Sequence, residues 1–220
     1  MRSATLETRS LRGAAATFWG FPTPWVLGTL LAAAVAARLA VGSWRWWHLL
    51  VAGGVVAAQP FVEWLLHVTV LHARPVRVAG RVLDLYVSRK HREHHADPRN
   101  LAGSFIPPRV LGYLLVLIAG ICAAIPGWPT RLTAAATMLT LGLLYEWTHF
   151  LIHSDYKPRH APYRALYIAH RLHHYRNEHY WYGVTGRLGD KVLGTNPARD
   201  DVPVSPTCRT LLEPVGASRS

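Results

Sequence analysis

The chain has 220 residues, of which half are hydrophobic and only 16% are charged. A soluble domain of this length usually carries more charge, so the composition favours a small membrane bundle over an ordinary soluble domain. The formal net charge of +12 by itself also suits a nucleic-acid-binding protein. The cysteines, Cys122 and Cys208, form no C-x-x-C pair and no disulfide framework, so any bound metal must be held by histidine and carboxylate.

The N-terminal segment, residues 1–24, begins "MRSATLETRSLRGAAATFWG". It contains arginines but no apolar core of 7–15 residues that ends in a cleavage site. We therefore expect a retained cytoplasmic or interfacial segment and not a signal peptide.

Four apolar runs follow, at residues 25–41, 46–66, 110–125 and 132–152. A membrane-spanning helix needs roughly 20 residues, and the two shorter runs reach this length with their flanking residues. The alternative is a buried four-helix core in a soluble protein, which the absence of a polar face on the third run disfavours. Pro60 is expected to bend or locally break the second helix about two turns before its end.

The linkers "GSWR" (42–45) and "PGWPTR" (126–131) are short enough to make each pair of runs a helical hairpin. Of the 24 Lys and Arg residues, 21 lie in segments 1–24, 73–109 and 154–220. The positive-inside rule then places both termini and the central segment in the cytoplasm, which weakens the nucleic-acid interpretation. Aromatic residues at the run ends fit an interfacial belt: Phe18, Trp19, Phe21, Trp25, Trp44, Trp46, Trp47 and Trp128.

The sequence therefore predicts an all-α fold of four transmembrane helices with a cytoplasmic helical cap. The expected division is an N-terminal segment (1–24), a membrane domain (25–200) and a disordered tail (201–220), because the tail shows no periodicity.

Ten of the thirteen histidines fall into four groups: His67 and His72; His91, His94 and His95; His149 and His153; His170, His173 and His174. On a helix, residues i, i+3 and i+4 lie within an arc of roughly 100°, so each triplet is expected to aim three imidazoles at one point. His67 and His72 are roughly 140° apart on an ideal helix. They serve one centre only if that helix end is distorted, and otherwise two neighbouring centres.

In the predicted topology all four groups meet just below the cytoplasmic membrane surface. Ten imidazoles exceed the four to six ligands of one ion and suit two ions, with about five nitrogens each and an open position. Imidazole binds iron, zinc and copper alike, so spacing does not identify the metal.

Carboxylates one turn before two of these groups are candidates to accept the second ring N–H of a histidine, namely Glu63 before His67 and Glu146 before His149. The rival interpretation makes Glu63 or Glu146 a metal ligand. Asp190 is a further candidate that folds back onto the cluster. His48 and His160 fit no group and are expected to be ordinary interfacial or loop residues.

The stretch after the last triplet is rich in aromatic side chains. Tyr175, Tyr180, Trp181 and Tyr182 are expected to line a substrate cavity or to anchor the protein at the interface. His179 lies off the repeated spacing and is grouped with Glu178 as a residue near the substrate or at the interface.

At these residues the chain resembles bacterial members of the fatty acid hydroxylase / sterol desaturase superfamily. The matching motifs are "EWLLHVTVLH", "HREHHADPRN", "YEWTHFLIHSDYKPR" and "HRLHHYRNEHYWYGVTGRLGDKVLGT", within about residues 60–195. The resemblance implies an integral membrane enzyme of the cytoplasmic membrane. It also implies two iron ions held by the ten histidines, and zinc can replace this iron on purification. The enzyme would use O2 and two electrons to hydroxylate or desaturate a lipid C–H bond, most simply in a fatty acyl chain.

The chain has no room for the haem domain fused to some relatives, so the resemblance implies no haem and a separate ferredoxin, cytochrome or reductase. A basic surface is the expected dock for such an acidic carrier: Arg89, Lys90, Arg92, Lys157, Arg159 and Arg164. Carotenoid β-ring hydroxylases share "AHRLHH", but the "YGVTGRLGDKVLGT" ending resembles the fatty acid hydroxylases more closely.

A metal transporter, or a membrane protein that uses metal only structurally, is the alternative of another class. A transporter would carry polar ligands near the bilayer midplane. Residues 113–121 and 134–142 contain only hydroxyl groups as candidates, which disfavours it.

Overall fold

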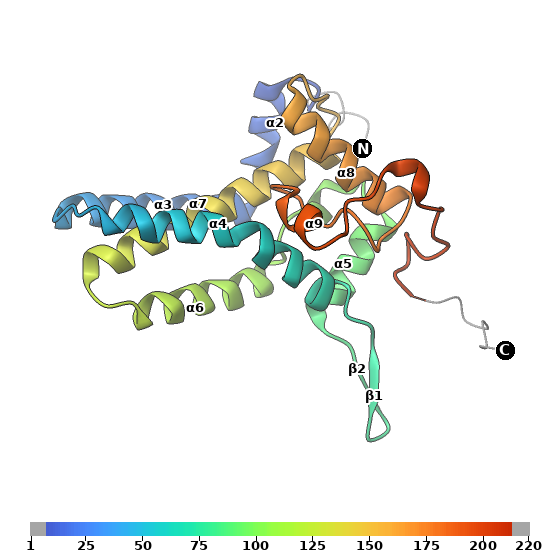
Figure 1. Ribbon diagram of the computed structural model, residues 1–220, viewed down its shortest axis with the longest axis horizontal. Helices are drawn as coiled ribbons and strands as arrows, with labels where there is room; N and C mark the ends of the chain where they lie inside the picture. Colours follow the sequence, from blue (N-terminus) through green and yellow to red (C-terminus); the bar gives the residue numbers. More distant parts are fainter. Residues whose placement is uncertain (1–7, 213–220) are drawn as a thin grey trace.

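The computed structural model describes residues 8–212, and most of them are helical (Figure 1). The helices are α2 (Leu11–Phe18), α3 (Pro22–Val41), α4 (Trp47–Leu66), α5 (Tyr86–Ala96), α6 (Pro108–Ala124), α7 (Trp128–His153), α8 (Ala161–Tyr175) and α9 (Leu188–Val192). Single turns add the π-helix η1 (His67–Leu71) and the 3-10 helices η2 (Leu101–Ser104) and η3 (Arg199–Asp201).

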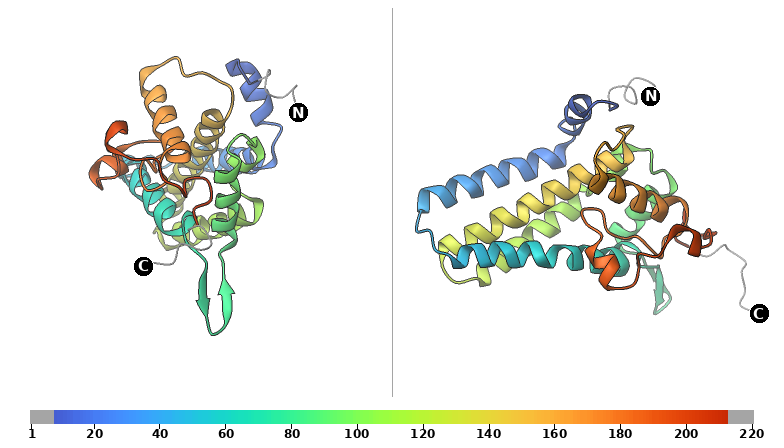
Figure 2. Two further views of the ribbon diagram at one scale, coloured as in Figure 1. Left: turned by 90° about the vertical axis from the view of Figure 1, so that its right-hand side faces the viewer. Right: turned by 45° about the horizontal axis from the view of Figure 1, so that its top comes forward.

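Helices α3, α4, α6 and α7 lie side by side as a long bundle, and α5, α8 and α9 form a cap at one end (Figures 1 and 2). Proline occupies the first turn of α3, α6 and α7, where its fixed φ suits a helix and its missing N–H costs nothing. Helix α3 begins at Pro22, so the predicted domain boundary after residue 24 falls inside its first turn.

Three segments are long and apolar enough to cross a membrane: Pro22–Val41, Trp47–Leu71 and Leu101–Ala124. Few of their residues are buried inside the protein, and their outer faces carry exposed apolar side chains such as Leu49, Val116 and Leu117. Exposed apolar surface of this extent, on helices long enough to cross a bilayer, indicates an integral membrane protein. The fourth predicted span forms α7, which has lower hydropathy because Arg131, Glu146, threonines and histidines interrupt it.

Helix α7 lies at the centre of the bundle and packs against α3, α4 and α6. Leu27, Leu111 and Leu139 form one buried apolar cluster between α3, α6 and α7. A second cluster joins α2 to the cap end of α7 through Phe18, Phe105 and Phe150. Tyr163 of α8 packs against the same cluster, so apolar contacts also anchor the cap to the bundle.

The far end of the bundle contains a buried arginine. Arg38 donates to the carbonyl of Gly42 and, at 2.9 Å, to Thr133 Oγ1, and it lies over the ring of Trp44. Its Nη2 is 3.0 Å from His48 Nδ1. His48, expected to be an ordinary interfacial residue, is thus buried and helps to fix the α3–α4 turn. A cation in the last turn of α3 also suits the helix dipole.

Of the bend or local break expected at Pro60, the break is absent, because α4 runs as one α-helix to Leu66. Helix α9 packs closely against this turn: a Cβ on Gly189 would lie 2.4 Å from the Pro60 carbonyl oxygen. Only glycine allows such an approach. The irregularity instead lies about two turns later, in η1.

Two regions depart from the predicted all-α fold with a disordered tail. Residues 76–83 form an antiparallel hairpin of β1 (Val76–Val78) and β2 (Arg81–Leu83), which projects from the cap (Figure 1). Residues 202–212 cross the cap, where Ser205 N donates to Arg176 O at 2.7 Å and Leu211 is buried. The tail prediction is wrong for these residues, because tertiary contacts order a segment without periodicity. Residues 1–7 and 213–220 lie outside the described part.

Candidate metal centre

The ten grouped histidines meet in the cap as two sets of five. Centre 1 consists of His67, His72, His91, His95 and His173, and centre 2 of His94, His149, His153, His170 and His174. Within each set, one ring nitrogen from every residue lies within 4.8 Å of all the others. All are buried except His72, which is partly buried.

The triplets do not each aim at one point, as the spacing had suggested. Helix α5 gives His91 and His95 to centre 1 but His94 to centre 2, and α8 divides its triplet in the reverse way. Residues four apart differ by only about 40° around a helix, whereas the i+3 residue lies about 60° to the other side. Each cap helix therefore contributes to both centres.

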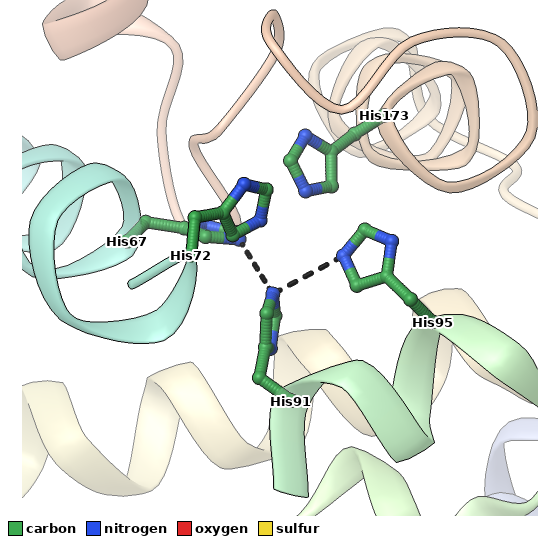
Figure 3. A group of neighbouring side chains, drawn as sticks. All are labelled: His67, His72, His91, His95 and His173. Carbon is green, nitrogen blue, oxygen red and sulfur yellow. Dashed lines mark hydrogen bonds between the residues drawn. The ribbon is translucent and has the colours of Figure 1, made fainter. Parts of the chain in front are cut away.

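The π-helix η1 resolves the awkward spacing of His67 and His72. The His72 N–H donates to the His67 carbonyl at 3.1 Å, which is the i→i+5 bond of a π turn. This wider turn brings residues five apart onto one face, and the two ring centroids lie 5.0 Å apart. The distorted helix end that a shared centre required is present, and Figure 3 shows both rings in centre 1.

Backbone carbonyls fix which ring nitrogen carries the proton. In centre 1, the Nδ1–H groups of His67, His95 and His173 donate to the carbonyls of Tyr182, Cys208 and Tyr180 at 2.7–2.9 Å. In centre 2, His149 Nδ1 donates to Ser104 O at 2.6 Å. Because a carbonyl only accepts, each neutral ring presents its Nε2 lone pair to the interior of the centre.

The converging nitrogens fit a bound cation. In centre 1, Nε2 of His67 and Nε2 of His95 lie 3.2 and 3.1 Å from His91 Nε2, which carries at most one proton. The Nε2 atoms of His72 and His173 are buried and have no hydrogen-bond partner among the described residues. Converging unpartnered lone pairs repel one another unless a cation lies between them.

Centre 2 has the same spacing. His153 Nε2 lies 3.1 Å from the Nε2 atoms of His94, His149 and His170, and His174 Nε2 lies 3.0 Å from His170 Nε2. Two nitrogens bound to one ion at about 2.1 Å and about 90° are ~3.0 Å apart. Both sets of five therefore suit one ion each.

Burial also keeps the cap histidines uncharged. It lowers the pKa of His95 to about 3, against the opposing effect of the Cys208 carbonyl. Burial is likewise the largest cause that lowers the pKa of His91, His94, His170, His173 and His174 well below the ordinary value. Neutral imidazole is the form that binds a metal ion.

Glu63 and Glu146 do not hold the imidazoles. Glu63 accepts hydrogen bonds from the backbone N–H groups of Val184 and Thr185, and Glu146 from Ile106 N at 2.8 Å. Neither carboxylate belongs to a candidate metal group. The two residues tie loops of the cap to α4 and α7, so the expectation that they orient His67 and His149 is wrong.

Asp190 does fold back towards the cluster, as expected. Its two oxygens accept from Tyr182 N at 2.9 Å and Gly183 N at 2.7 Å. The Tyr182 carbonyl in turn accepts from His67 Nδ1. Asp190 thus acts on centre 1 through the backbone.

The aromatic residues of the same loop have different positions. The Tyr182 ring lies 5.2–5.5 Å from the rings of His67, His72 and His173 and covers centre 1. Trp181 instead packs against Ala169 and Val202. Its φ of +57° is a left-handed conformation that side chains rarely adopt, and the carbonyls on either side of it both bind histidines of centre 1.

The remaining predicted residues lie further out. Tyr175 is exposed between Arg171 and Arg209, and only the carbonyl of Tyr180 reaches the centre. His179 is exposed, with its Nε2 3.4 Å from Glu178. Of the predicted electron-carrier dock, Arg92 is engaged with Asp84 at 2.5 Å, and Lys90 pairs with Glu93.

Sequence reasoning missed Tyr145, whose ring centroid lies 5.6 Å from that of His149. Its position four residues before His149, on the same helix face, was the available signal. The carbonyl acceptors Ser104 and Cys208 were also missed, and no side-chain pattern could have indicated them.

Two cavities reach the histidines from different sides. One of about 390 Å³ lies near the cap ends of α3 and α6. Its walls are mainly apolar, with Phe21, Phe105, Ile106 and Pro107, and they also include His94, Lys90, Glu93 and Asp97. The other, of about 170 Å³, includes His72 and Tyr182. Each centre thus has one cavity beside it.

Membrane-length helices with a histidine-rich metal-binding cluster at one end define the class of histidine-rich membrane metalloproteins. Within this class the chain belongs to the fatty acid hydroxylase family, whose model matches residues 52–195. The expected family resemblance is confirmed, and the protein is an oxidoreductase that acts in lipid hydroxylation.

Two similar proteins come from Arabidopsis thaliana. The dihydroceramide fatty acyl 2-hydroxylase FAH2 is 25% identical over 180 residues, which cover 82% of this chain and 73% of that protein. The corresponding FAH1 is 28% identical over 138 residues, which cover 62% of this chain and 56% of that protein. No solved structure gives a significant match.

Proposed function

We propose that this protein is an integral-membrane, O2-dependent hydroxylase that uses two iron ions to oxidise a C–H bond of a fatty acyl lipid. One observation carries this proposal: ten imidazoles, nine of them buried and one partly buried, converge in two sets of five at the end of an apolar helical bundle. Family membership supports iron as the metal and a lipid as the substrate.

The five histidines of centre 1 would hold one ion, and the five of centre 2 the other. When bound, iron would supply the activation of O2 that cleavage of an unreactive C–H bond requires. The protein residues orient the imidazoles through backbone carbonyls, keep them neutral and exclude water by burial. Zinc would fit the same nitrogen donors without redox activity.

We assign α7 as a fourth span. Its first turns contact the far end of α3 through Thr133 and Arg38, and its last residue, His153, belongs to centre 2. A helix of 26 residues is about 39 Å long, which exceeds the hydrocarbon thickness. The excess of Lys and Arg at the cap end supports, by the positive-inside rule, a cytoplasmic position for the metal centre and both termini in a bacterial cell.

The position of the centres favours oxidation near the polar end of the lipid. The histidines lie in and beside the cap, and the apolar cavity beside His94 opens where α3 and α6 begin. An acyl chain that extends from this cavity into the bundle would place carbons close to its head group beside centre 2. The dihydroceramide fatty acyl 2-hydroxylases act near the head of an acyl chain, so a similar acyl lipid is the proposed substrate here.

Electrons would come from a separate ferredoxin, cytochrome or reductase. Exposed cations on the cap, such as Arg89, Arg159 and Arg164, would attract an acidic carrier. Arg92 is excluded from this surface by its ion pair.

Comparative lipid mass spectrometry tests the proposal. A bacterial host that expresses the protein should accumulate lipids heavier by one oxygen atom, and fragmentation should place that oxygen on the acyl chain. The control is the double variant His170→Ala/His174→Ala, expressed at the same level. A carotenoid with an added hydroxyl would show that the substrate is a carotenoid and not an acyl lipid. Lipids lacking two hydrogens would show that the reaction is desaturation and not hydroxylation. No oxidised lipid together with uptake of metal into the cells would favour transport.

A further inference from the structure

The smaller cavity beside centre 1 differs from the apolar cavity in its lining. It has a volume of about 170 Å³ and is bounded by His72, Arg74, Glu178, His179, Tyr182 and Leu211. A water molecule occupies about 30 Å³ in the liquid, so the cavity has room for several. Its polar walls suit water better than an acyl chain.

Glu178 is a buried acid with an incompletely satisfied carboxylate. The side chain is 2% exposed, and its Oε1 accepts a hydrogen bond from Thr207 Oγ1. Its Oε2 is buried and has no partner among the described residues. A carboxylate oxygen in that position requires a water molecule or a proton, because an unpaired buried charge is costly.

His179 links this acid to the surrounding solution. Its side chain is 56% exposed, and its Nε2 lies 3.4 Å from Glu178 Oε1. Imidazole is the side chain that most readily takes up and releases protons near neutral pH. An exposed histidine, a buried acid and His72 of centre 1 thus line one polar cavity.

The hydroxylation under "Proposed function", on which this inference rests, consumes protons. One C–H bond and the O–O bond break, and C–O and O–H bonds form. The external donor supplies two electrons, two protons are taken up, and one oxygen atom leaves as water.

We propose that His179 and Glu178 form a proton path, which carries protons from the cytoplasm through the water-sized cavity to centre 1. The path is specific to centre 1, because the cavity includes His72 but no histidine of centre 2. The lipid would therefore reach the site from the other side, beside His94.

Several charged or titratable groups face the path. From the end of α4 and η1 come His72 and Arg74, and from the loop after α8 comes Tyr182. Cys208 also lies close to Glu178, and burial raises the pKa of its thiol, which stays uncharged at neutral pH. Arg74 is the permanent cation among these groups.

The test compares Glu178→Gln and His179→Ala with the matched controls Asp200→Asn and His160→Ala. Asp200 and His160 are exposed residues outside both cavities. All four variants should retain the iron content of the wild type. Glu178→Gln should lower hydroxylation on the order of 10²-fold, the usual contribution of a proton-transfer group. His179→Ala should be partly rescued by added imidazole, and both controls should behave like the wild type.

An independent readout does not depend on turnover. Infrared spectra of the purified protein should contain a carboxyl band that moves in D2O and is absent in Glu178→Gln. Its exchange with D2O should be slower in His179→Ala. If both path variants match the wild type in hydroxylation, pH profile and D2O exchange, the proton path is wrong. The hydroxylase function would be unaffected by that result. A wild-type protein that loads iron but oxidises no lipid would instead contradict the function, and the infrared comparison would still decide the path.

Discussion

At the scale of single residues, the second ring nitrogen determines what each histidine can do. Four Nδ1–H groups donate to backbone carbonyls, and this hydrogen bond fixes the Nε2 lone pair towards the centre. The identity of the ten histidines was predictable from their spacing. Their acceptors were not, because a carbonyl is present at every residue and only the fold selects which one meets an imidazole. For this reason Glu63 and Glu146 were plausible but wrong partners.

Histidine variants should remove metal from one centre at a time. The double variant His170→Ala/His174→Ala removes two of the five nitrogens of centre 2, and His91→Ala/His95→Ala does the same for centre 1. We expect each to lower the iron content from about two ions per chain to about one and to abolish hydroxylation. Elemental analysis of the purified proteins measures this, with His160→Ala as the control. Full loading of either double variant would contradict the five-plus-five division.

Asp190 should affect centre 1 through the loop that it holds. Asp190→Ala removes the acceptor for two backbone N–H groups, and the Tyr182 carbonyl is then no longer fixed against His67. Loss of an outer hydrogen bond of this kind lowers metal affinity roughly 10–100-fold. Competition with a chelator should therefore remove one of the two ions more easily than in the wild type. Equal retention of both ions would show that the loop is held by other contacts.

At the scale of elements, the π turn was only one of two alternatives that the sequence allowed. The spacing of His67 and His72 indicated either a distorted helix end or two separate centres, and no propensity distinguishes these alternatives. Pro60 does not break the helix, and α9 packs against α4 at that turn through Gly189. Such a contact between segments that are distant in sequence cannot be predicted from local patterns.

Changing the length of the π turn tests its role. An alanine inserted after Thr69 would place the two histidines six residues apart, about 240° around an α-helix, and should cost centre 1 its ion. Deletion of Thr69, an exposed residue, would convert the turn to ordinary i→i+4 spacing, which keeps both rings on one face. Iron content should therefore be lower in the insertion variant than in the deletion variant. The reverse order would show that the π turn does not set the geometry.

At the scale of the whole molecule, a lipid-facing bundle supports a cap in which distant segments cooperate. Hydrophobic run lengths predicted the bundle, because lipid requires long apolar helices. They did not predict the hairpin at residues 76–83 or the ordered structure of residues 202–212. These depend on contacts such as that of Arg176 Nε with the Val202 carbonyl, 2.7 Å long, between segments without periodicity.

The C-terminal segment should be required for metal binding. A chain that stops after residue 201 loses the Cys208 carbonyl that orients His95 and the Thr207 hydroxyl that binds Glu178. We expect lower thermal stability and a lower iron content at centre 1. A chain that stops after residue 212 retains both contacts and serves as the control. If both truncations load iron like the full chain, the segment is dispensable, as a disordered tail would be.

The most direct test of the account is an anomalous difference map, collected at the iron absorption edge from crystals of the protein purified with its metal. The account predicts two iron peaks per chain, one among His67, His72, His91, His95 and His173 and the other among His94, His149, His153, His170 and His174. A single peak, or iron bound away from these imidazoles, would contradict it.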